Sequence, residues 1–321
     1  MNYPSGNGIG IGLVSMDQDI ATEIRQLKRQ QKAVILAHNY QRAEIQDIAD
    51  YVGDSLDLAK TATKTNAEVI IFCGVDFMGE SAKILNPEKT VIIPDRNAQC
   101  PMAAMADPVA LKALKKKNPA AAVVSYINTS AQIKALSDIC CTSANGVAVI
   151  QSLENKEILF VPDANLGAYI KRFVTDKKIE IWPGFCPTHD EIQPNDILTI
   201  KNQHPSAEIL VHPECRPEVI DIADQVFSTN GMVRYAANSK VNEFIIGTEI
   251  GLCYRLETEF PNKSFYPIPK AICPNMKKIT LNKVLKSLKT LEPQLILPDN
   301  LLKKAKKPLQ RMMDVGRGDH N

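Results

Sequence analysis

Short continuous runs of apolar residues, separated by longer stretches of mixed polarity, recur along the whole chain. A run of this kind is typical of a strand that is buried on both faces of a parallel sheet. The runs cover 33–37, 68–72 and 90–93, then 121–125, 157–161 and 180–182, and finally 208–211, 243–246 and 264–266. Because the stretches between many of them favour helices, the alternation predicts an α/β fold with parallel sheets.

Polar residues and glycines near the strand ends recur at nearly constant intervals. The first strands of the three groups end at His38, Tyr126 and His212, which are 88 and 86 residues apart. Three Cys-Pro pairs begin at Cys100, Cys186 and Cys273, which are 86 and 87 residues apart. Two further series share the spacing, namely Ser55, Ser143 and Ser228, and Gly79, Gly167 and Gly251. We therefore interpret the chain as three copies of one unit.

Units of this length are domain-sized, so we predict three α/β/α domains with small parallel sheets, related by a pseudo-threefold axis. Ligands of such sheets bind beyond the carboxyl ends of the strands, so the polar residues should meet at a central cavity. The predicted domains span 20–105, 106–191 and 192–290. Residues 1–19 are an N-terminal extension, loosely held to about residue 17, and a first helix follows over about 19–32. Within 291–321, a helix near 301–315 is expected to pack back on the core, against one domain.

Composition and charge exclude several classes of protein. Hydrophobic residues make up 45% of the 321 residues and charged residues 23%, as in ordinary soluble proteins. The net charge of +2 gives no reason to expect nucleic acid binding, and the lysine runs at 115–117 and 303–307 are interpreted as solvated helix faces. No apolar run approaches the roughly 18–20 residues that span a membrane, and no signal peptide is recognisable. We therefore expect a cytoplasmic protein without membrane or nucleic acid partners.

The three periodic cysteines indicate a metal centre. In a reducing compartment, the eight cysteines are buried thiols, metal ligands or catalytic groups before they are disulfides. Three thiolates can hold a [4Fe–4S] cluster whose fourth iron has no protein ligand. Zinc held by the three cysteines and His189 is the alternative, but structural zinc ligands usually come in short pairs, which favours iron–sulfur. The other cysteines are interpreted as buried thiols; they are Cys73, Cys140, Cys141, Cys215 and Cys253.

Other side chains near the strand ends are candidates for ligand binding. Three of the five histidines, His38, His189 and His212, suggest anion binding or proton transfer if they converge, although a lone histidine is more often structural. Ser55, Ser143, Ser228 and Thr229 can be helix N-caps, anion donors or both. Tyr40, Tyr126 and Asn128 can pack or face the site. Glu214 is the candidate general acid or base, and the whole set suits a small polyanionic substrate.

Eleven short motifs, spread from about residue 20 to 315, carry a resemblance to a known family. They are AHNYQ (37–41), GDSLDLA (53–59), PDRNAQCPMA (94–103), SYINTSA (125–131), TSANG (142–146), FVPDANLG (160–167), WPGFCPTH (182–189), VHPEC (211–215), STNGM (228–232), GTEIGL (247–252) and CPNMKKIT (273–280). With these motifs the chain resembles the quinolinate synthase family. The resemblance implies three α/β domains around a [4Fe–4S] cluster. It also implies the condensation of iminoaspartate with dihydroxyacetone phosphate to quinolinate, phosphate and water.

Residue roles carry over motif by motif. Cys100, Cys186 and Cys273 resemble the cluster ligands, and His38, Tyr40 and Glu214 resemble catalytic groups. The residues that resemble substrate-binding groups are His38, Ser55, Tyr126, Asn128, Ser143, His189, His212, Glu214, Ser228 and Thr229. Some members have a CxxCxxC motif at the third cysteine, whereas this chain has Cys273 alone, so a disulfide switch there is not expected.

The sequence also suggests one functional partner and leaves two alternative functions open. An L-aspartate-oxidising enzyme is a possible functional partner, since some enzyme must supply iminoaspartate. An iron–sulfur redox or oxygen sensor without catalysis stays open as an alternative, and so does a zinc-stabilised structural protein. Iron content separates the zinc alternative from the others, and a quinolinate assay separates a sensor from an enzyme.

Overall fold

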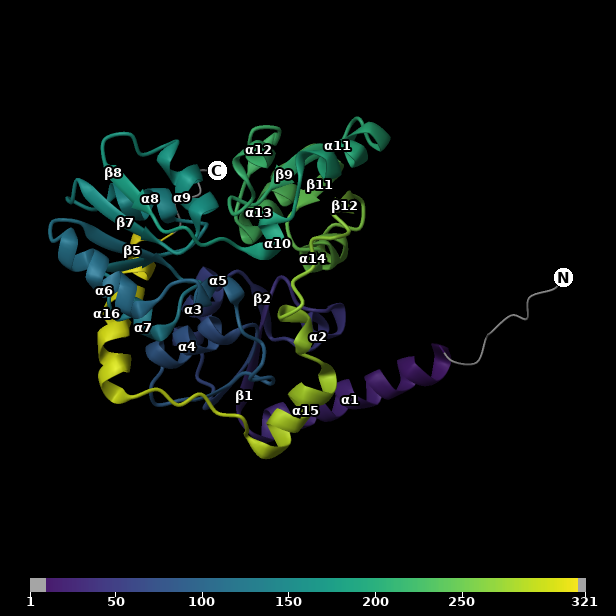
Figure 1. Cartoon of the computed structure of the whole chain (residues 1–321). Coiled ribbons are helices and arrows are strands. Elements are labelled where there is room, and N and C mark those ends of the chain that lie inside the picture. The colour runs from purple at the N-terminus through teal and green to yellow at the C-terminus, as the bar shows by residue number, and fades with distance from the viewer. Residues whose placement is uncertain (1–9, 317–321) are drawn as a thin grey trace.

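The computed structural model of the chain describes residues 10–316, and their side chains from residue 18 onward. Within that range the chain forms three four-stranded parallel sheets with the same strand order (Figure 1). The first is β2(Tyr51–Gly53)-β1(Ala33–His38)-β3(Val69–Cys73)-β4(Thr90–Ile92). The second is β6(Ile139–Cys141)-β5(Ala122–Tyr126)-β7(Glu157–Val161)-β8(Lys178–Ile181), and the third is β10(Gln225–Val226)-β9(Glu208–Val211)-β11(Glu243–Gly247)-β12(Ser264–Pro267). The predicted α/β class with three small parallel sheets is confirmed.

Each sheet has one strand more than the pattern predicts. The additional edge strands β2, β6 and β10 are only two or three residues long, so they carry no recognisable apolar run. An aspartate directly before each of them binds the backbone of the first strand in its unit, or repeat; these strands are β1, β5 and β9. The carboxylates of Asp50, Asp138 and Asp224 each accept the N–H of the residue 15 positions earlier, at 2.8 Å. These aspartates therefore fix the start of every edge strand.

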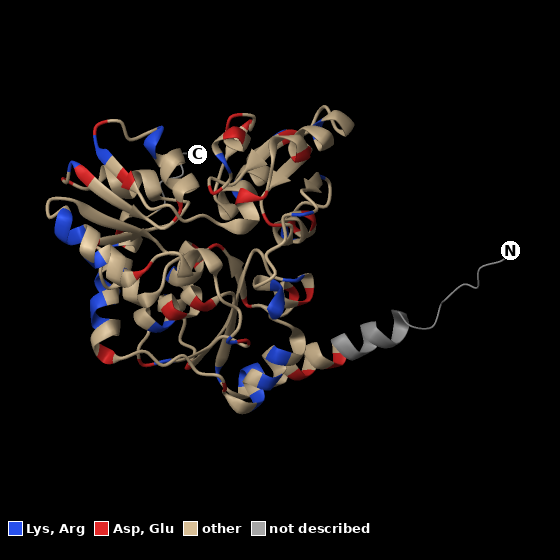
Figure 2. Ribbon diagram, viewed as in Figure 1, with Lys and Arg blue, Asp and Glu red and all other residues tan. Residues whose placement is uncertain are grey.

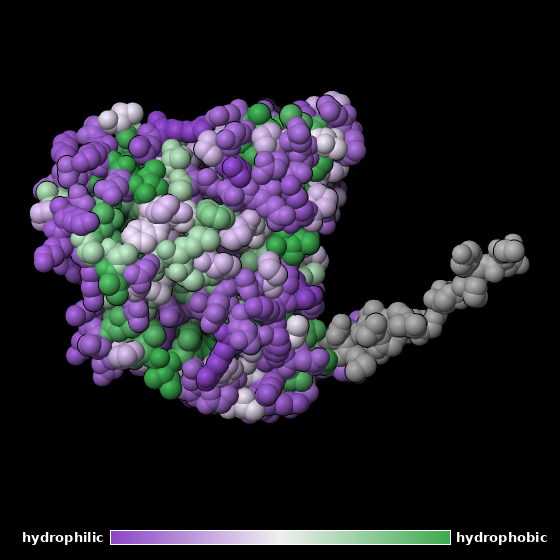
Figure 3. Space-filling view, viewed as in Figure 1, coloured by the Kyte–Doolittle hydropathy of each residue, from purple (hydrophilic) through white to green (hydrophobic). Residues whose placement is uncertain are grey.

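Helices connect the strands and cover the sheets. They are α2(Ala43–Ile48), α3(Ser55–Lys64), α4(Asp76–Leu85), α5(Pro101–Ala104), α6(Pro108–Lys117), α7(Ala131–Lys134), α8(Gly146–Gln151), α9(Ala164–Lys171), α10(Pro187–Asp190), α11(Pro194–Gln203), α12(Pro217–Ile220), α13(Thr229–Asn238), α14(Gly251–Glu259) and the 3-10 turn Met276–Lys278. Charged residues lie mainly on the outer helices and loops, and fewer lie where the repeats meet (Figure 2). On the face shown in Figure 3, apolar and weakly polar surface gathers at that meeting point.

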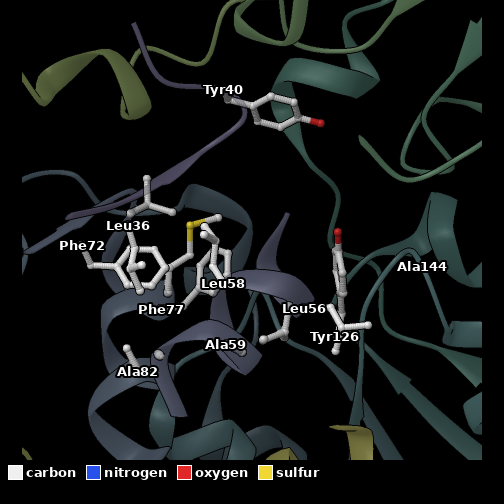
Figure 4. Close-up of a cluster of buried hydrophobic side chains, with 14 of the residues drawn as sticks. Leu36, Tyr40, Leu56, Leu58, Ala59, Phe72, Phe77, Ala82, Tyr126 and Ala144 are labelled. Atoms are coloured by element: carbon white, nitrogen blue, oxygen red, sulfur yellow. The ribbon is translucent and has the colours of Figure 1, made fainter. Parts of the chain in front are cut away.

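Two of the periodic glycines allow a helix to lie close to its sheet. A Cβ at Gly79 in α4 would lie 2.6 Å from Ile93, and one at Gly167 in α9 would lie 2.7 Å from Ile181. Any larger residue would therefore push the helix outward. In the first repeat, the packed layer between helices and sheet includes Leu36, Leu58, Phe72 and Phe77 (Figure 4).

Two sequence expectations about the chain ends are corrected. The first helix, α1(Gly10–Gln30), begins at Gly10 rather than near residue 19, because the low helix propensity of glycine is only a weak preference. Residues 1–9, part of the predicted extension, lie outside the described range. The tail helix α16(Asp299–Val315) packs against β6, α7 and α8 of the second repeat and also against α4 of the first, rather than on one domain. Before it, α15(Leu281–Thr290) packs on α1.

A helix that crosses a bilayer must be long and apolar, which can be checked for the described helices. None of those within residues 10–316 combines the length and the apolar character needed to cross a membrane.

Candidate functional site

Strand ends and loops from all three repeats line one cavity of about 130 Å³. The lining includes every site residue expected from the sequence except Ser228: they are His38, Tyr40, Ser55, Cys100, Tyr126, Asn128, Ser143, Cys186, His189, His212, Glu214, Thr229 and Cys273. Ser228 lines a neighbouring pocket, and its hydroxyl caps α13 by accepting the Gly231 N–H at 3.2 Å. No lysine or arginine is among the described residues that line the cavity.

The three cysteines share one local structure. Each is half-buried and stands before a proline and a short helical turn, whereas the other five cysteines are buried. Each thiol accepts a backbone hydrogen bond from the residue three positions later; the donors are Ala103, His189 and Met276. Burial raises the pKa of all three thiols, and Cys100 is near enough to both Cys186 and Cys273 for their charges to interact. The Cys-Pro sequence thus places three thiols at helix starts that face one space.

This donor set fits a metal centre. A bound metal keeps its thiol ligands deprotonated, which overcomes the raised pKa values. A second group of possible ligands, the side chains of Cys186, His189 and Glu214, has its donor atoms within 4.8 Å of one another. His189 Nδ1 lies 3.2 Å from Cys186 Sγ. The geometry therefore fits both a metal centre held by the three cysteines and one held by the three cysteines and His189.

Glu214 lies at the centre of the polar contacts in the cavity. It is 3% exposed, and its Oε2 lies 2.8 Å from His189 Nδ1 and 3.4 Å from His212 Nδ1. Its Oε1 accepts the Asn128 amide at 3.4 Å, and the Tyr126 hydroxyl also donates to the carboxylate. Although burial acts to raise the pKa of Glu214, the two histidines and these donors lower it to about 2. The carboxylate is therefore an acceptor that the Asn128 amide and the Tyr126 hydroxyl hold in place.

His38 and His212 are neutral and have the same orientation. Burial lowers the pKa of each to about 3, and in each case Nδ1 accepts the backbone N–H two residues later, at 3.2 Å from Tyr40 and 3.3 Å from Glu214. Since Nδ1 is an acceptor, the ring proton is on Nε2 in both. The Nε2–H of His212 can donate to Ser143 Oγ, which is 3.2 Å away.

A threonine that the sequence analysis missed links two of the site residues. Thr248 Oγ1 lies 2.6 Å from the Tyr40 hydroxyl and 2.8 Å from His189 Nε2. Tyr40 and Tyr126 lie at the margin of the packed layer with their hydroxyls pointing away from it (Figure 4). Burial raises the pKa of Tyr40 well above its usual range, so its hydroxyl keeps its proton. Thr248 directly follows a buried strand, which was the available signal.

One buried polar atom in the cavity wall has no partner within residues 10–316. There, Asn128 Oδ1 accepts no hydrogen bond, although its amide nitrogen donates to Glu214. Buried polar atoms in folded proteins are normally paired, so such an atom indicates where a ligand donor or a water can bind. Its position on the cavity wall supports the expectation that Asn128 binds substrate.

Comparison with known proteins gives a consistent result. The family model for quinolinate synthetase A protein matches residues 22–314. The chain is 52% identical to quinolinate synthase 2 of Methanosarcina acetivorans over 305 residues, which cover 95% of this chain and 98% of the relative. It is 53% identical to the quinolinate synthase of Thermodesulfovibrio yellowstonii, over 91% of this chain and 97% of the relative. It is 52% identical to that of Dehalococcoides mccartyi, over 92% and 98%.

Proposed function

The chain belongs to the quinolinate synthetase A family, and from this premise we propose that it condenses iminoaspartate with dihydroxyacetone phosphate. The products are quinolinate, phosphate and water, in the de novo synthesis of NAD. The observation that carries the proposal is the convergence of three thiols and a set of neutral donors, contributed by three repeats, on one cavity. Such a cavity can hold a metal centre and a small anionic substrate together.

Cys100, Cys186 and Cys273 are the proposed ligands of a [4Fe–4S] cluster. When bound, this group supplies an iron without a protein ligand, which acts as a Lewis acid on nitrogen or oxygen. The thiol hydrogen bonds from Ala103, His189 and Met276 prepare the sulfur atoms for that role, because a hydrogen bond to the charged form favours it.

Neutral donors hold the carboxylates and the phosphate of the substrates. Hydrogen bonds to ionised oxygens are roughly twice as strong as neutral ones, and directed donors select the geometry of the anion. The proposed substrate-binding residues are His38, Ser55, Tyr126, Asn128, Ser143, His189, His212, Glu214 and Thr229. Ser228 belongs to this set through the N-terminus of α13, which it caps and which positions Thr229.

Tyr40, His38 and Glu214 are the proposed acid–base groups. The Tyr40 hydroxyl keeps its proton at neutral pH and is the proposed acid, whereas His38 is a neutral imidazole whose Nε2–H can donate a hydrogen bond to the reacting group. The Glu214 carboxylate is an acceptor, and His189 Nδ1 at 2.8 Å can share the proton that it takes up. General acid–base catalysis by a positioned group contributes about 10²–10⁴-fold to the rate. Proton transfers during ring closure and loss of water would pass through these atoms.

The substitution Glu214→Gln tests the proposal. It preserves the shape of the side chain and removes the proton acceptor, so we expect quinolinate formation to fall about 100-fold or more while iron content stays unchanged. Glu218→Gln, at an exposed carboxylate of the same repeat, is the matched control and should behave as wild type. Turnover near the wild-type rate in Glu214→Gln would remove Glu214 from the mechanism.

Metal content tests the proposed cofactor. Anaerobically purified protein should contain about four iron and four sulfide per chain, and Cys186→Ala should lose them. One zinc per chain without sulfide would overturn the iron–sulfur assignment. We also propose that the enzyme is cytoplasmic. Its iminoaspartate would come from an L-aspartate-oxidising partner. If iron is present but no quinolinate forms under anaerobic conditions, the sensor alternative replaces the enzyme.

A further inference from the structure

Each repeat has an acidic residue just beyond its third strand in the chain, close to the start of the next helix. These residues are Asp76, Asp163 and Glu249, at intervals of 87 and 86 residues. Each lies 23 or 24 positions before the cysteine of its own repeat. Asp163 and Glu249 are fully buried and Asp76 is half-buried. None of the three was singled out by the sequence analysis.

In the first and third repeats, the carboxylate joins the cysteine to a helix start. Asp76 Oδ1 accepts the Cys100 N–H at 3.0 Å and its own helix's Phe77 N–H at 2.9 Å. Glu249 Oε1 accepts the Cys273 N–H at 3.1 Å, and its Oε2 accepts the Gly251 N–H at 2.7 Å. The cysteine loop is thus fastened to α4 in one repeat and to α14 in the other.

The second repeat makes the same connection. Asp163 Oδ1 caps α9 by accepting the Leu166 N–H at 2.8 Å, and the Cys186 N–H is close enough to interact with this carboxylate. The backbone adds a second link, since the Ala164 N–H donates to the Gly184 carbonyl at 2.7 Å. The remaining oxygen, Asp163 Oδ2, is buried and has no hydrogen-bond partner among the described residues. In all three repeats, a carboxylate therefore accepts an N–H from the first turn of a helix and lies beside the N–H of the cysteine.

The three carboxylates are not explained by charge pairing alone. Glu249 forms an ion pair with Lys277, at 2.9 Å, but among the described residues neither Asp76 nor Asp163 has an ion-pair partner. Burying a carboxylate without a cation is unfavourable unless hydrogen bonds compensate. The feature common to the three carboxylates is that each lies beside the backbone N–H of the cysteine in its own repeat. This contact is therefore the common reason for their positions.

We propose that Asp76, Asp163 and Glu249 are positioning residues that fasten the three metal-binding cysteines and keep each cysteine N–H from donating to sulfur. The proposal rests on the proposed function, because it takes these cysteines as the cluster ligands. Residues that orient metal ligands typically change metal affinity by about 10- to 100-fold when substituted. Hydrogen bonds to the sulfur atoms are one determinant of the reduction potential of an iron–sulfur cluster. The carboxylates would thus set both the retention of iron and the potential.

Alanine and asparagine variants of the anaerobically purified holoenzyme test this role. Asp76→Ala and Asp163→Ala remove the acceptor, and we expect iron loss to a ferrous chelator to become about 10- to 100-fold faster. The midpoint potential should also become more positive, because the freed cysteine N–H can donate to sulfur. Asp76→Asn and Asp163→Asn retain an acceptor oxygen and should restore values near those of wild type. Glu249→Ala should act as the other alanine variants do.

A control separates this role from general destabilisation. Asp107→Ala removes an exposed helix N-cap, since Asp107 caps α6 by accepting the Ala110 N–H at 2.6 Å and has no hydrogen bond to a cysteine among the described residues. It should leave the rate of iron loss and the potential unchanged. Folded alanine variants with wild-type rate and potential would overturn the proposal, as would asparagine variants no better than alanine. Wild-type protein without iron and sulfide would instead refute the proposed function.

Discussion

The substitution Thr248→Val tests how the site holds Tyr40 and His189. Valine has nearly the shape of threonine, so the change removes one hydroxyl from a fully buried position. Two contacts disappear, at 2.6 Å to the Tyr40 hydroxyl and at 2.8 Å to His189 Nε2. However, these two partners lie 3.3 Å apart and can bind one another, so one net hydrogen bond is lost. The expected loss of stability is about 1.5 kcal/mol, the upper end for a single bond.

The thermal consequence depends on how much of the chain unfolds together. Unfolding entropy is about 2.1 cal/mol/K per residue, so 321 residues unfolding as one unit give a fall in Tm of about 2 °C. If one repeat of about 90 residues unfolded alone, the fall would be about 8 °C. Differential scanning calorimetry of the wild-type and variant proteins measures this shift.

Activity provides the second measurement. Without the Thr248 hydroxyl, Tyr40 and His189 lose the hydrogen bonds that fix the orientation of their side chains. Small displacements of catalytic groups can lower rates by up to about 10²-fold, so we expect kcat to fall at least about 10-fold with iron content unchanged. Thr248→Ser keeps the hydroxyl and is the control. A valine variant with wild-type Tm and kcat would show that Thr248 does not position these groups.

Two further predictions follow from the contacts. His38 and His212 stay neutral in the folded protein, with pKa values of about 3, but take up protons below about pH 6.5 when unfolded. Stability should therefore fall as pH falls from about 6.5 toward 3, by about 2 kcal/mol per histidine at pH 5. Urea unfolding at pH 7.5 and 5 should show a correspondingly weaker pH dependence in His38→Gln, and an unchanged dependence would contradict the assignment. Arg255 Nη1 donates to Asn39 Oδ1 at 2.7 Å and Asn230 Oδ1 at 2.9 Å, joining the first and third repeats. Arg255→Met should lower the free energy of unfolding by about 2 kcal/mol, against no change for the exposed Lys240→Met, and equal stabilities would refute the link.

The fold could be predicted from sequence because its signals are repeated. Continuous apolar runs identify the central strands, and period alone identifies three units. The edge strands escaped prediction because two or three residues, some of them exposed, produce no pattern. Their positions are nevertheless encoded in Asp50, Asp138 and Asp224, whose intervals of 88 and 86 residues match those of the strand ends. A search for every periodic acidic residue would have found them.

The site residues also include some that the sequence identifies and some that it does not. Side chains that sit in recognisable motifs, such as Cys186 and His189, can be selected by their spacing and chemistry alone, and the fold brings them to the cavity. Thr248 could not be selected, because a threonine after a strand has no distinctive chemistry until its neighbours are known. Ser228 shows another limit, because its period matches that of Ser143, whereas its hydroxyl caps α13 and it lines a neighbouring pocket. Sequence spacing identifies a place in the unit, but it does not give the direction of a side chain.

The wide separation of the three thiols has a consequence for the assembly of the protein. Cys100, Cys186 and Cys273 are 86 and 87 residues apart, so a metal centre bound to all three would close two long loops of chain. By analogy with disulfides, each closure removes about 4.6 kcal/mol of unfolded-chain entropy. Binding of the centre would therefore hold together the three parts of the chain that carry these cysteines. Loss of the centre would then lower the stability of the folded protein, in addition to removing its chemistry.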